Sequence, residues 1–583
     1  MSSPPSPLIP LSPRRARKER FRFVGKCTGE CGLTLALLLF VGTFAIVPYL
    51  RLIAEGVAPG GHFDPSILAR VLSAPRTWLA TERTLATALA SMVIAVLLGG
   101  ALALLVGITD LPGKRALAFA AVLPIMIPSQ VTAIAWINLL DPSSPLLHLL
   151  DLAPATGTAN PLYGFGGISL LMGLEHAPLV FLALRAGLAN LPGEAIEAAE
   201  AAGAKRGRIL RTVVLPMSMP ALAAGAALAF VSALGNFGTP ALLGIPAGYS
   251  VLTVLIYQQL AGFGPQAISE IAVLSLLLGA IAVLGLVVQG LIGARRIVRW
   301  ARPPTRRLLP LRNWRWPLAI LAWAILGVTV VMPLAALAAT ALVPAYGVPL
   351  SPGTITAENF RYLAQDAATA RAAFNSLFLA ITTALVLALV SVALGYIVVW
   401  RQSPIARLLN LAAELPYALP GVVLALAAIL VFIHPLPLIG ISLYGTLGII
   451  LVAYFARFLV LALRTTTAGY LQIDRALEDA AAISGASLWR RLRTILLPMA
   501  APAVAAGAIL VFLIALNELT VSALLWSSGH ETLGVVVFSL EQGGDATLAA
   551  ALSLLVVLAT VLLMGIASLV ARRLPRGVLP WQG

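Results

Sequence analysis

The chain has 583 residues, of which 60% are hydrophobic and only 11% are charged. Because a soluble globular protein carries about 25% charged residues, this composition excludes an ordinary soluble domain. A formal net charge of +16 would suggest nucleic-acid binding in a soluble protein, but here the positions of the positive residues argue for a membrane topology signal and against a nucleic-acid partner.

Long runs without Asp, Glu, Lys or Arg predict an all-α, polytopic membrane protein. About 20 apolar residues cross a bilayer as a helix, and these runs are too long and too uniformly apolar for the alternating strands of a barrel. The first run continues to Leu50, longer than a signal-peptide core, and is therefore interpreted as a retained span. About twelve transmembrane helices are expected, near 32–54, 84–108, 115–140, 165–188, 218–243, 270–293, 317–342, 375–400, 407–433, 440–463, 500–526 and 547–571.

Lys and Arg in short loops mark the cytoplasmic side of a membrane protein. With a cytoplasmic N-terminus, the positive residues concentrate in the predicted inner segments, and the C-terminus is then cytoplasmic as well. Those segments are 1–31, 109–114, 189–217, 294–316, 401–406, 464–499 and 572–583. Anionic membrane lipid is the expected partner of this excess positive charge.

An internal repeat divides the chain into two homologous six-helix halves. When Gly203 is aligned with Gly485, an offset of 282 residues, acidic, Ala, Arg and Leu-Pro-Met positions coincide on both sides of the glycine. Six predicted spans separate the two copies, so both copies face the same side of the membrane. The predicted organisation is a basic cytoplasmic tail at 1–31, a first permease-like domain at 32–293, a cytoplasmic linker at 294–316 and a second permease-like domain at 317–583.

Each repeated segment predicts a short, smooth helix at the cytoplasmic surface, one around 194–204 and the other around 474–486. Ala favours the helix and presents little bulk, an acidic residue near the start suits the helix dipole, and Gly at the far end suits a left-handed terminus. A Leu-Pro pair then marks the beginning of the next element. The residues selected for contact with another protein are Glu197, Ala198, Ala199, Gly203, Asp479, Ala480, Ala481 and Gly485.

These two segments resemble the cytoplasmic coupling loop, or EAA loop, of permease subunits from bacterial binding-protein-dependent ABC importers. Asp479 stands where that family usually has Glu, a mild departure. The resemblance implies the ABC type I importer permease fold, in the bacterial inner membrane, with coupling loops near 189–217 and 464–499. It also implies two copies of a cytoplasmic ATP-binding subunit and a periplasmic substrate-binding protein as partners.

The chain is expected to be a transporter subunit without enzymatic activity of its own. It contains no G-x-x-x-x-G-K-[ST] phosphate loop, so ATP hydrolysis is assigned to a separate partner subunit. Its five histidines are scattered, and Cys27 and Cys31 alone do not indicate a metal site or a disulfide framework. Accordingly, no catalytic residue, metal site or cofactor is predicted.

Polar residues inside predicted spans indicate candidates for a translocation path, because such groups are costly in a bilayer. Asn236 aligns with Glu518, and Asn517 is adjacent to Glu518; these three are the selected candidates. Hydrogen bonding between helices is the competing interpretation. Glu414 and Arg457 are a candidate structural pair, and the Pro and Gly residues of LPYALPGVV at 415–423 predict a break or bend in that helix.

The fused two-permease arrangement, together with ALGNFGTPALLGIP at 233–246 and AAELPYALPGVVLAL at 412–426, resembles iron(III) permeases most. Related permeases for thiamine, polyamine, phosphonate or sugar-type substrates share the architecture and stay open as alternatives. An ion-gradient-driven secondary transporter is a second class, although the loop TDLPGKR at 109–115 lacks that class's usual motif. A membrane scaffold or sensor without transport is a third.

Overall fold

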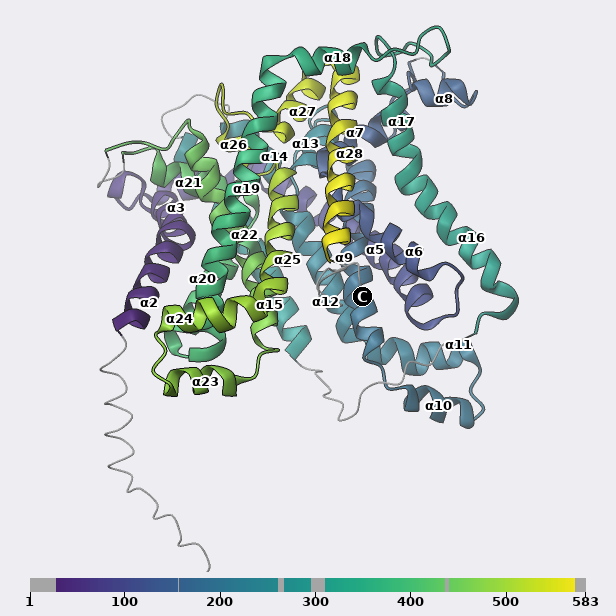
Figure 1. Ribbon diagram of the computed structural model, residues 1–583. Helices are drawn as coiled ribbons and strands as arrows, with labels where there is room; N and C mark the ends of the chain where they lie inside the picture. Colours follow the sequence, from purple (N-terminus) through teal and green to yellow (C-terminus); the bar gives the residue numbers. More distant parts are fainter. Residues whose placement is uncertain (1–27, 156, 261–266, 295–309, 436–439, 572–583) are drawn as a thin grey trace, which may run out of the picture.

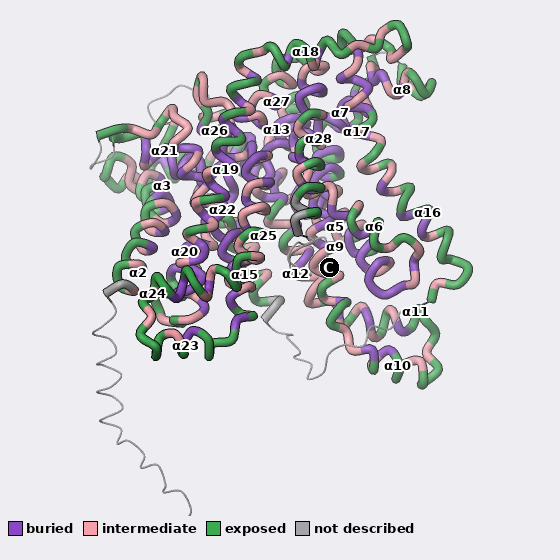
Figure 2. The backbone as a smooth tube through the Cα atoms, viewed as in Figure 1, coloured by how far each residue is buried: buried purple, intermediate pink, exposed green. Residues whose placement is uncertain are grey.

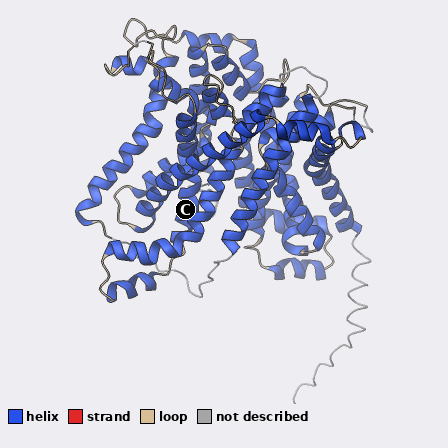
Figure 3. Cartoon of the chain, turned by 180° about the vertical axis from the view of Figure 1, so that it is seen from behind, coloured by secondary structure: helices blue, strands red, loops and turns tan. Residues whose placement is uncertain are grey.

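The computed structural model describes residues 28–571, apart from residues 156, 261–266, 295–309 and 436–439. Helices connected by loops make up the described residues, and no β-strand occurs among them (Figures 1 and 3). The predicted basic tail up to Cys27, most of the linker at 294–316 and the C-terminal segment after Ala571 lie outside the described residues.

The N-terminal half contains the elements from α2 to α15. Its main helices are α2 (Thr28–Val41), η1 (Gly42–Ile46), α3 (Val47–Val57), α4 (Pro65–Ser73), α5 (Pro75–Ile108), α6 (Lys114–Val122), η3 (Leu123–Met126), α7 (Ser129–Leu140), α8 (Pro145–Leu149), α9 (Phe165–Ala189), α10 (Gly193–Ala201), α11 (Arg206–Ile209), η4 (Leu210–Val214), α12 (Leu215–Leu234), α13 (Gly238–Gly244), α14 (Leu252–Leu260) and α15 (Ala267–Ala294).

The C-terminal half repeats this order. Its main helices are α16 (Arg315–Leu326), η6 (Gly327–Val331), α17 (Met332–Ala341), α18 (Glu358–Gln365), α19 (Ala367–Tyr396), η7 (Ile397–Arg401), α20 (Pro404–Ala418), α21 (Gly421–Phe432), α22 (Leu447–Tyr470), α23 (Arg475–Ile483), α24 (Leu488–Arg491), η8 (Leu492–Leu496), α25 (Leu497–Leu516), α26 (Ser522–Leu525), α27 (Leu533–Gln542) and α28 (Ala546–Ala571).

Ten helices in the described part of the chain are long and apolar enough to cross a membrane, or twelve if each of two bent pairs counts as one span. Large apolar side chains stay exposed along these helices, for example Leu97 at 68% and Leu389 at 71% (Figure 2). An exposed apolar surface of this extent suits contact with lipid rather than with water. The prediction of an all-α polytopic membrane protein is therefore confirmed.

The third and ninth predicted spans are each a bent pair of helices, which corrects the expectation of one continuous helix at 115–140 and agrees with the break expected within 407–433. The segments Lys114–Met126 and Ser129–Leu149 meet at 101°, and Pro404–Ala418 and Gly421–Phe432 meet at 111°. Ile127 and Leu419, which precede Pro128 and Pro420, are both extended. Proline disfavours the α conformation of the residue before it, and because that residue is extended at both of these positions, the preceding helix ends there. The break predicted for LPYALPGVV is confirmed.

Each bent pair must nevertheless connect opposite ends of the molecule. Helices α10, α23 and the beginning of α2 all lie at the same end, the lower one in Figure 1. For these three elements to lie at the same end, the chain must cross the molecule an even number of times between α2 and α10, and again between α10 and α23. Counting each bent pair as one crossing satisfies this condition in both intervals, in agreement with twelve spans.

Four spans contain a π-helical turn directly before a proline-containing segment. The turns η1, η4, η6 and η8 each end two residues before a proline. These prolines are Pro48, Pro216, Pro333 and Pro498. Proline removes one backbone donor and clashes with the carbonyl group four residues earlier, and a wider turn relieves that clash. The helices therefore continue through Leu-Pro. The observed spans begin at Arg206 and Leu488, earlier than the predicted starts near 218 and 500.

The first span of each half packs against the opposite half. Phe40 and Phe44 of the first span each lie 6.1 Å, between ring centroids, from Phe455 of α22 in the C-terminal half. Likewise, Thr329 and Leu334 from the first span of the C-terminal half line a pocket together with α5, α7 and α9 of the N-terminal half. Each half thus packs its first span on the other half, and the two larger core clusters contain residues of both halves.

Candidate functional site

The two repeated segments form α10 and α23, which project from the lower end of the molecule in Figure 1, one below each half. Figure 3 shows the same arrangement from behind. Both helices are nine residues long and are followed by a short turn and a second helix, α11 or α24, that leads into the next span. The structure therefore places the two predicted segments as equivalent elements at one end of the molecule.

Both helices end in the same left-handed motif. The φ angles of Gly203 and Gly485 are 76° and 81°. After the first helix, Ala204 N donates to Ala199 O at 3.0 Å and Gly203 N donates to Glu200 O at 2.9 Å. The corresponding bonds in the second copy are Ala486 N to Ala481 O at 3.0 Å and Gly485 N to Ala482 O at 3.1 Å. This is the Schellman pattern, so the predicted left-handed helix terminus is confirmed at both glycines.

The small side chains selected from the sequence lie on the accessible side of these helices. Glu197 and Ala198 are exposed on α10, Asp479 and Ala480 are exposed on α23, and Ala199 and Ala481 are half-buried. Both glycines are exposed, and a Cβ built on either would meet no atom within 4 Å. An incoming surface could thus approach the backbone of both helices closely.

The second copy carries bulky apolar side chains that sequence comparison of the two loops did not single out. Ile483 is 88% exposed and Trp489 is 71% exposed. Their counterparts at the offset of 282 are Ala201 and Gly207. The two candidate docking surfaces therefore share a helix and a terminus but differ in apolar area. The sequence does contain a sign of this difference, because Ile483 and Trp489 are large apolar residues in a loop that is expected to be polar.

The candidate path residues are hydrogen-bonded within the protein. Asn236 Nδ2 donates to Glu175 Oε2 at 3.0 Å, and its Oδ1 accepts from Thr239 N at 3.3 Å. At the equivalent place in the second half, Glu518 accepts from Val521 N at 2.8 Å and from Ser522 N at 3.2 Å. Asn236 and Glu518 therefore cap the beginnings of α13 and α26.

Asn517 occupies a different position from its neighbour Glu518. Its Nδ2 donates to Leu513 O at 3.0 Å and to Thr560 Oγ1 of α28 at 3.3 Å. These bonds satisfy its amide without a substrate. The structure therefore brings Asn236 and Glu518 to equivalent positions but does not bring Asn517 to the same group.

The candidate pair of Glu414 and Arg457 is not formed among the described residues. Glu414 Oε1 instead accepts from Asn410 Nδ2 of the same helix at 3.1 Å. Arg457 lies against the break between α20 and α21, where a Cβ on Gly421 would be 2.3 Å from its Nη1. Glu175, at the position equivalent to Arg457, likewise lines a pocket with Pro124 and Ile127 at the break before α7. Each break is thus accompanied by one half-buried ionisable residue, an acid in the N-terminal half and a base in the C-terminal half.

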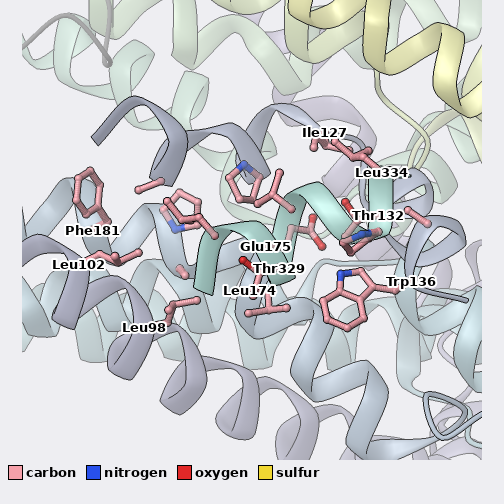
Figure 4. Close-up of a pocket in the computed structure, with 18 residues that line it drawn as sticks. Leu98, Leu102, Ile127, Thr132, Trp136, Leu174, Glu175, Phe181, Thr329 and Leu334 are labelled. Atoms are coloured by element: carbon pink, nitrogen blue, oxygen red, sulfur yellow. The ribbon is translucent and has the colours of Figure 1, made fainter. Parts of the chain in front are cut away.

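Figure 4 shows the pocket that contains Glu175. Its walls come from both halves, because Leu98 and Leu102 of α5 and Trp136 of α7 face Thr329 and Leu334 of the first span of the C-terminal half. The wall is mostly apolar, and the carboxylate of Glu175 is bonded to Asn236. An ionisable side chain at this depth is a functional candidate, although this one already has a partner.

Three aromatic rings join the two halves away from α10 and α23. Phe237 lies 5.0 Å from Tyr257 of α14 and 5.7 Å from Phe538 of α27, and Tyr257 lies 6.0 Å from Phe538, between ring centroids. Helices α14 and α27 lie in the upper part of Figure 1. Rings from two halves in mutual contact close the space between them at this level.

The structure is that of a membrane permease with internal duplication. The first span of each half packs on the other half, and each half has a broken span and a projecting helix at the same end. The model of the family described as "Binding-protein-dependent transport system inner membrane component" matches residues 95–302 and 391–579. The chain belongs to this family and is a multi-pass inner membrane protein of the ABC importer class.

Individual relatives support the fused arrangement. A protein of Sinorhizobium fredii named "probable ABC transporter permease protein" is 28% identical over 80% of this chain and 83% of its own length. A ferric transport system permease protein of Actinobacillus pleuropneumoniae is 25% identical over 88% of this chain and 74% of its own length. A relative in Salmonella paratyphi A, whose name assigns it provisionally to 2-aminoethylphosphonate transport, is 31% identical over 28% of this chain and 61% of its own length.

Proposed function

We propose that this chain moves a substrate, delivered by a periplasmic binding protein, into the cytoplasm, and that α10 and α23 each dock on one of two ATP-hydrolysing subunits. The single observation that supports this most is the repeated helix with its identical Schellman terminus, exposed twice at one end of the molecule. The end carrying α10 and α23 is then cytoplasmic, and both termini of the chain lie on that side.

The proposed mechanism is alternating access between the two halves. In the structure, the rings of Phe237, Tyr257 and Phe538 join the halves in the part farther from the coupling helices. Closure of the ATP-hydrolysing subunits would push α10 and α23, and this movement would separate the rings and admit substrate from the outer side. Asn236 and Glu518, which cap short helices beside this level, stay proposed as residues along the path.

Site-specific crosslinking tests the docking. Single cysteines replacing Ala198 or Ala480, both exposed, are expected to crosslink to the ATP-hydrolysing subunit encoded with this permease. The native Cys27 and Cys31 are first replaced by serine. A cysteine replacing Ile355, exposed in the segment before α18 at the other end of the molecule, is the matched control and is expected to give no crosslink. Failure of both loop cysteines to crosslink would remove the basis of the proposal.

Iron(III) is the substrate we propose, supported by the ferric transport permease among the relatives at 25% identity. A phosphonate is the alternative, because another relative at 31% identity carries a name referring to 2-aminoethylphosphonate transport. The test is to purify the binding protein encoded beside this permease and to measure which of the two it binds. Uptake of radioactive iron into proteoliposomes containing the complete complex is expected to require that binding protein and ATP.

An ion-gradient-driven secondary transporter is the competing class. It predicts uptake by the permease alone under a proton or sodium gradient, without any ATP-hydrolysing subunit. The proposal predicts no such uptake, and gradient-driven transport by the purified chain would contradict it.

A further inference from the structure

A group of charged and polar side chains holds α23, the second of the two repeated helices. We call Glu30, Tyr396, Arg401, Glu478 and Arg491 the ionic cluster. Its members come from the beginning of the first span, the end of the eighth, α23 and α24. The side chains of Arg491, Glu478 and Glu30 are only 9%, 10% and 15% exposed.

The bonds of the ionic cluster form a closed network. Arg491 forms ion pairs with Glu478 through Nη1 and with Glu30 through Nη2, the latter at 3.2 Å. Arg401 also pairs with Glu30, and it donates to the hydroxyl group of Tyr396 at 3.0 Å. That hydroxyl group lies 3.2 Å from Oε1 of Glu478 and 3.2 Å from Oε1 of Glu30. Because Arg491, Glu478 and Glu30 are largely withdrawn from solvent, salt screens the interactions among these three much less than it screens a surface pair.

The N-terminal half has isoleucine at the equivalent positions. The offset of 282 relates Glu478 to Ile196 and Arg491 to Ile209. Tyr396 corresponds to Ile108, because Gly395 packs against Tyr470 as Gly107 packs against Leu188, and Tyr470 and Leu188 are related by the same offset. All three isoleucines are buried in one apolar cluster. At these three positions, the two halves therefore use different chemistry, isoleucine in the first and Tyr396, Glu478 and Arg491 in the second.

The ionic cluster also joins parts of the molecule that the chain order separates. Glu30 and Arg491 are 461 residues apart, and α2 belongs to the N-terminal half by sequence. The same span continues through η1 into α3, where a Cβ on Gly56 would lie 2.6 Å from a methyl group of Leu276 in α15. A displacement of α23 can thus reach a helix of the N-terminal half through one continuous span.

We propose that Glu478 and Arg491 are positioning residues that clamp the second coupling helix to the first span, so that movement at α23 is transmitted to both halves of the permease. This inference rests on the proposed function. Under it, the second coupling helix drives the bundle through a directional, charge-dependent joint.

Removing one partner of a buried ion pair leaves an uncompensated charge, whereas replacing the whole group by apolar residues of similar volume is often tolerated. This asymmetry makes the clamp testable. The variants are Arg491→Met and Glu478→Gln, which each remove one partner, Arg491→Lys, which keeps the charge, and the triple variant Tyr396→Ile, Glu478→Ile and Arg491→Ile, which imitates the first half. Ile209→Met in the N-terminal half is the matched control.

The measurement is the ratio of substrate transported to ATP hydrolysed, in proteoliposomes holding the full complex. We expect Arg491→Met and Glu478→Gln to hydrolyse ATP with a transport ratio reduced at least fivefold. Arg491→Lys and the triple isoleucine variant are expected to keep at least half of the wild-type ratio, and Ile209→Met to keep it nearly whole. Co-purification of the ATP-hydrolysing subunit is expected with every variant.

An unchanged ratio in both Arg491→Met and Glu478→Gln would overturn the clamp. A triple variant that assembles but transports no better than the single variants would overturn it as well. Should Arg491→Met fail to accumulate, Glu478→Gln and the triple variant carry the same test, because Arg491 keeps Glu30 as an ionic partner in the first and is itself replaced in the second. If the wild-type complex itself neither assembles nor transports with ATP, the proposed function fails instead, so the two failures are distinguishable.

Discussion

Gly203 and Gly485 lie 282 residues apart in the chain and adopt the same left-handed backbone conformation, each closing a nine-residue helix. Neither is required for space, because a Cβ at either position would meet nothing within 4 Å. Their shared requirement is the positive φ angle, which places the following residue for the bond that ends the helix. The identity of these residues thus follows from backbone geometry alone.

Replacing Gly203 or Gly485 by valine should therefore impair transport without creating a clash. A β-branched residue at positive φ costs at least about 1–2 kcal/mol, which will displace the end of the helix. Gly207→Val is the control, because this neighbouring glycine also has open space around its Cβ and does not have a positive φ. We expect transport to fall severalfold in the first two variants and little in the control. Equal loss in all three would contradict the argument.

The extra apolar area on the second loop should make it the tighter docking surface. Ile483→Ala and Trp489→Ala are expected to weaken binding of the ATP-hydrolysing subunit by about 1–3 kcal/mol each, the range for the minority of interface side chains that act as large apolar anchors. Isothermal titration of the detergent-solubilised permease measures this. Ile355→Ala removes a similarly exposed side chain at the other end and should leave the affinity unchanged.

Gly421 should resist substitution for a steric reason. A Cβ at this position would lie 2.3 Å from Arg457 Nη1 and 2.9 Å from Thr520 Cγ2. Gly421→Ala must therefore push the guanidinium group away from the break between α20 and α21, at a cost of about 1–3 kcal/mol. Gly100→Ala is the control, since its Cβ would meet only ordinary contacts at 3.8 Å and beyond. A thermal midpoint lowered in Gly421→Ala but not in Gly100→Ala is expected.

Glu541 predicts a pH dependence of stability. This residue lies near the end of α27, outside the long spans, and its Oε2 is buried without a hydrogen-bond partner. Burial, with a smaller contribution from the negative charge of Asp141, raises the pKa of Glu541 from 4.5 to about 7. Since the folded state holds this proton more tightly than the unfolded state, the carboxylate destabilises the fold increasingly from pH 4.5 to 7, and fully above pH 7.

Glu541→Gln should consequently raise the thermal midpoint at pH 8 and change it little at pH 4. The measurement is thermal unfolding of both proteins in detergent across this range. Asp545→Asn, which changes an exposed carboxylate three residues beyond α27, is the control and should show no such trend. A stabilisation that is the same at both pH values would show that the charge is not the cause.

The sequence predicted the membrane class, the repeat and the two projecting helices because each rests on local pattern. Runs of apolar residues identify spans wherever they pack, and a small-residue helix followed by glycine has the same terminus in both copies. The break at Pro420 was also predictable, since proline acts on its immediate neighbour. Span limits were less accurate at Leu215-Pro216, because a π turn lets the helix continue through a residue that usually begins a new element.

Contacts between distant residues were beyond the reach of that reasoning. Glu414 and Arg457 looked like a pair in the sequence, but the fold gives Glu414 a neighbour on its own helix instead. Asn236 and Glu518 could be aligned, yet only the structure showed that both cap short helices. The apolar side chains of Ile483 and Trp489 were visible in the sequence but were not recognised as exposed.

By itself, the sequence determined what each segment is: a span, a broken span, a short helix with a glycine terminus, and a second copy of all three. The tertiary structure alone decided which segments meet, including the exchange of first spans between the halves and the encounter of Glu30 with Arg491 across 461 residues of chain. The physical reason is that hydropathy and backbone preference act over a few residues. A buried ion pair, in contrast, exists only once packing has brought its partners together and removed the water between them.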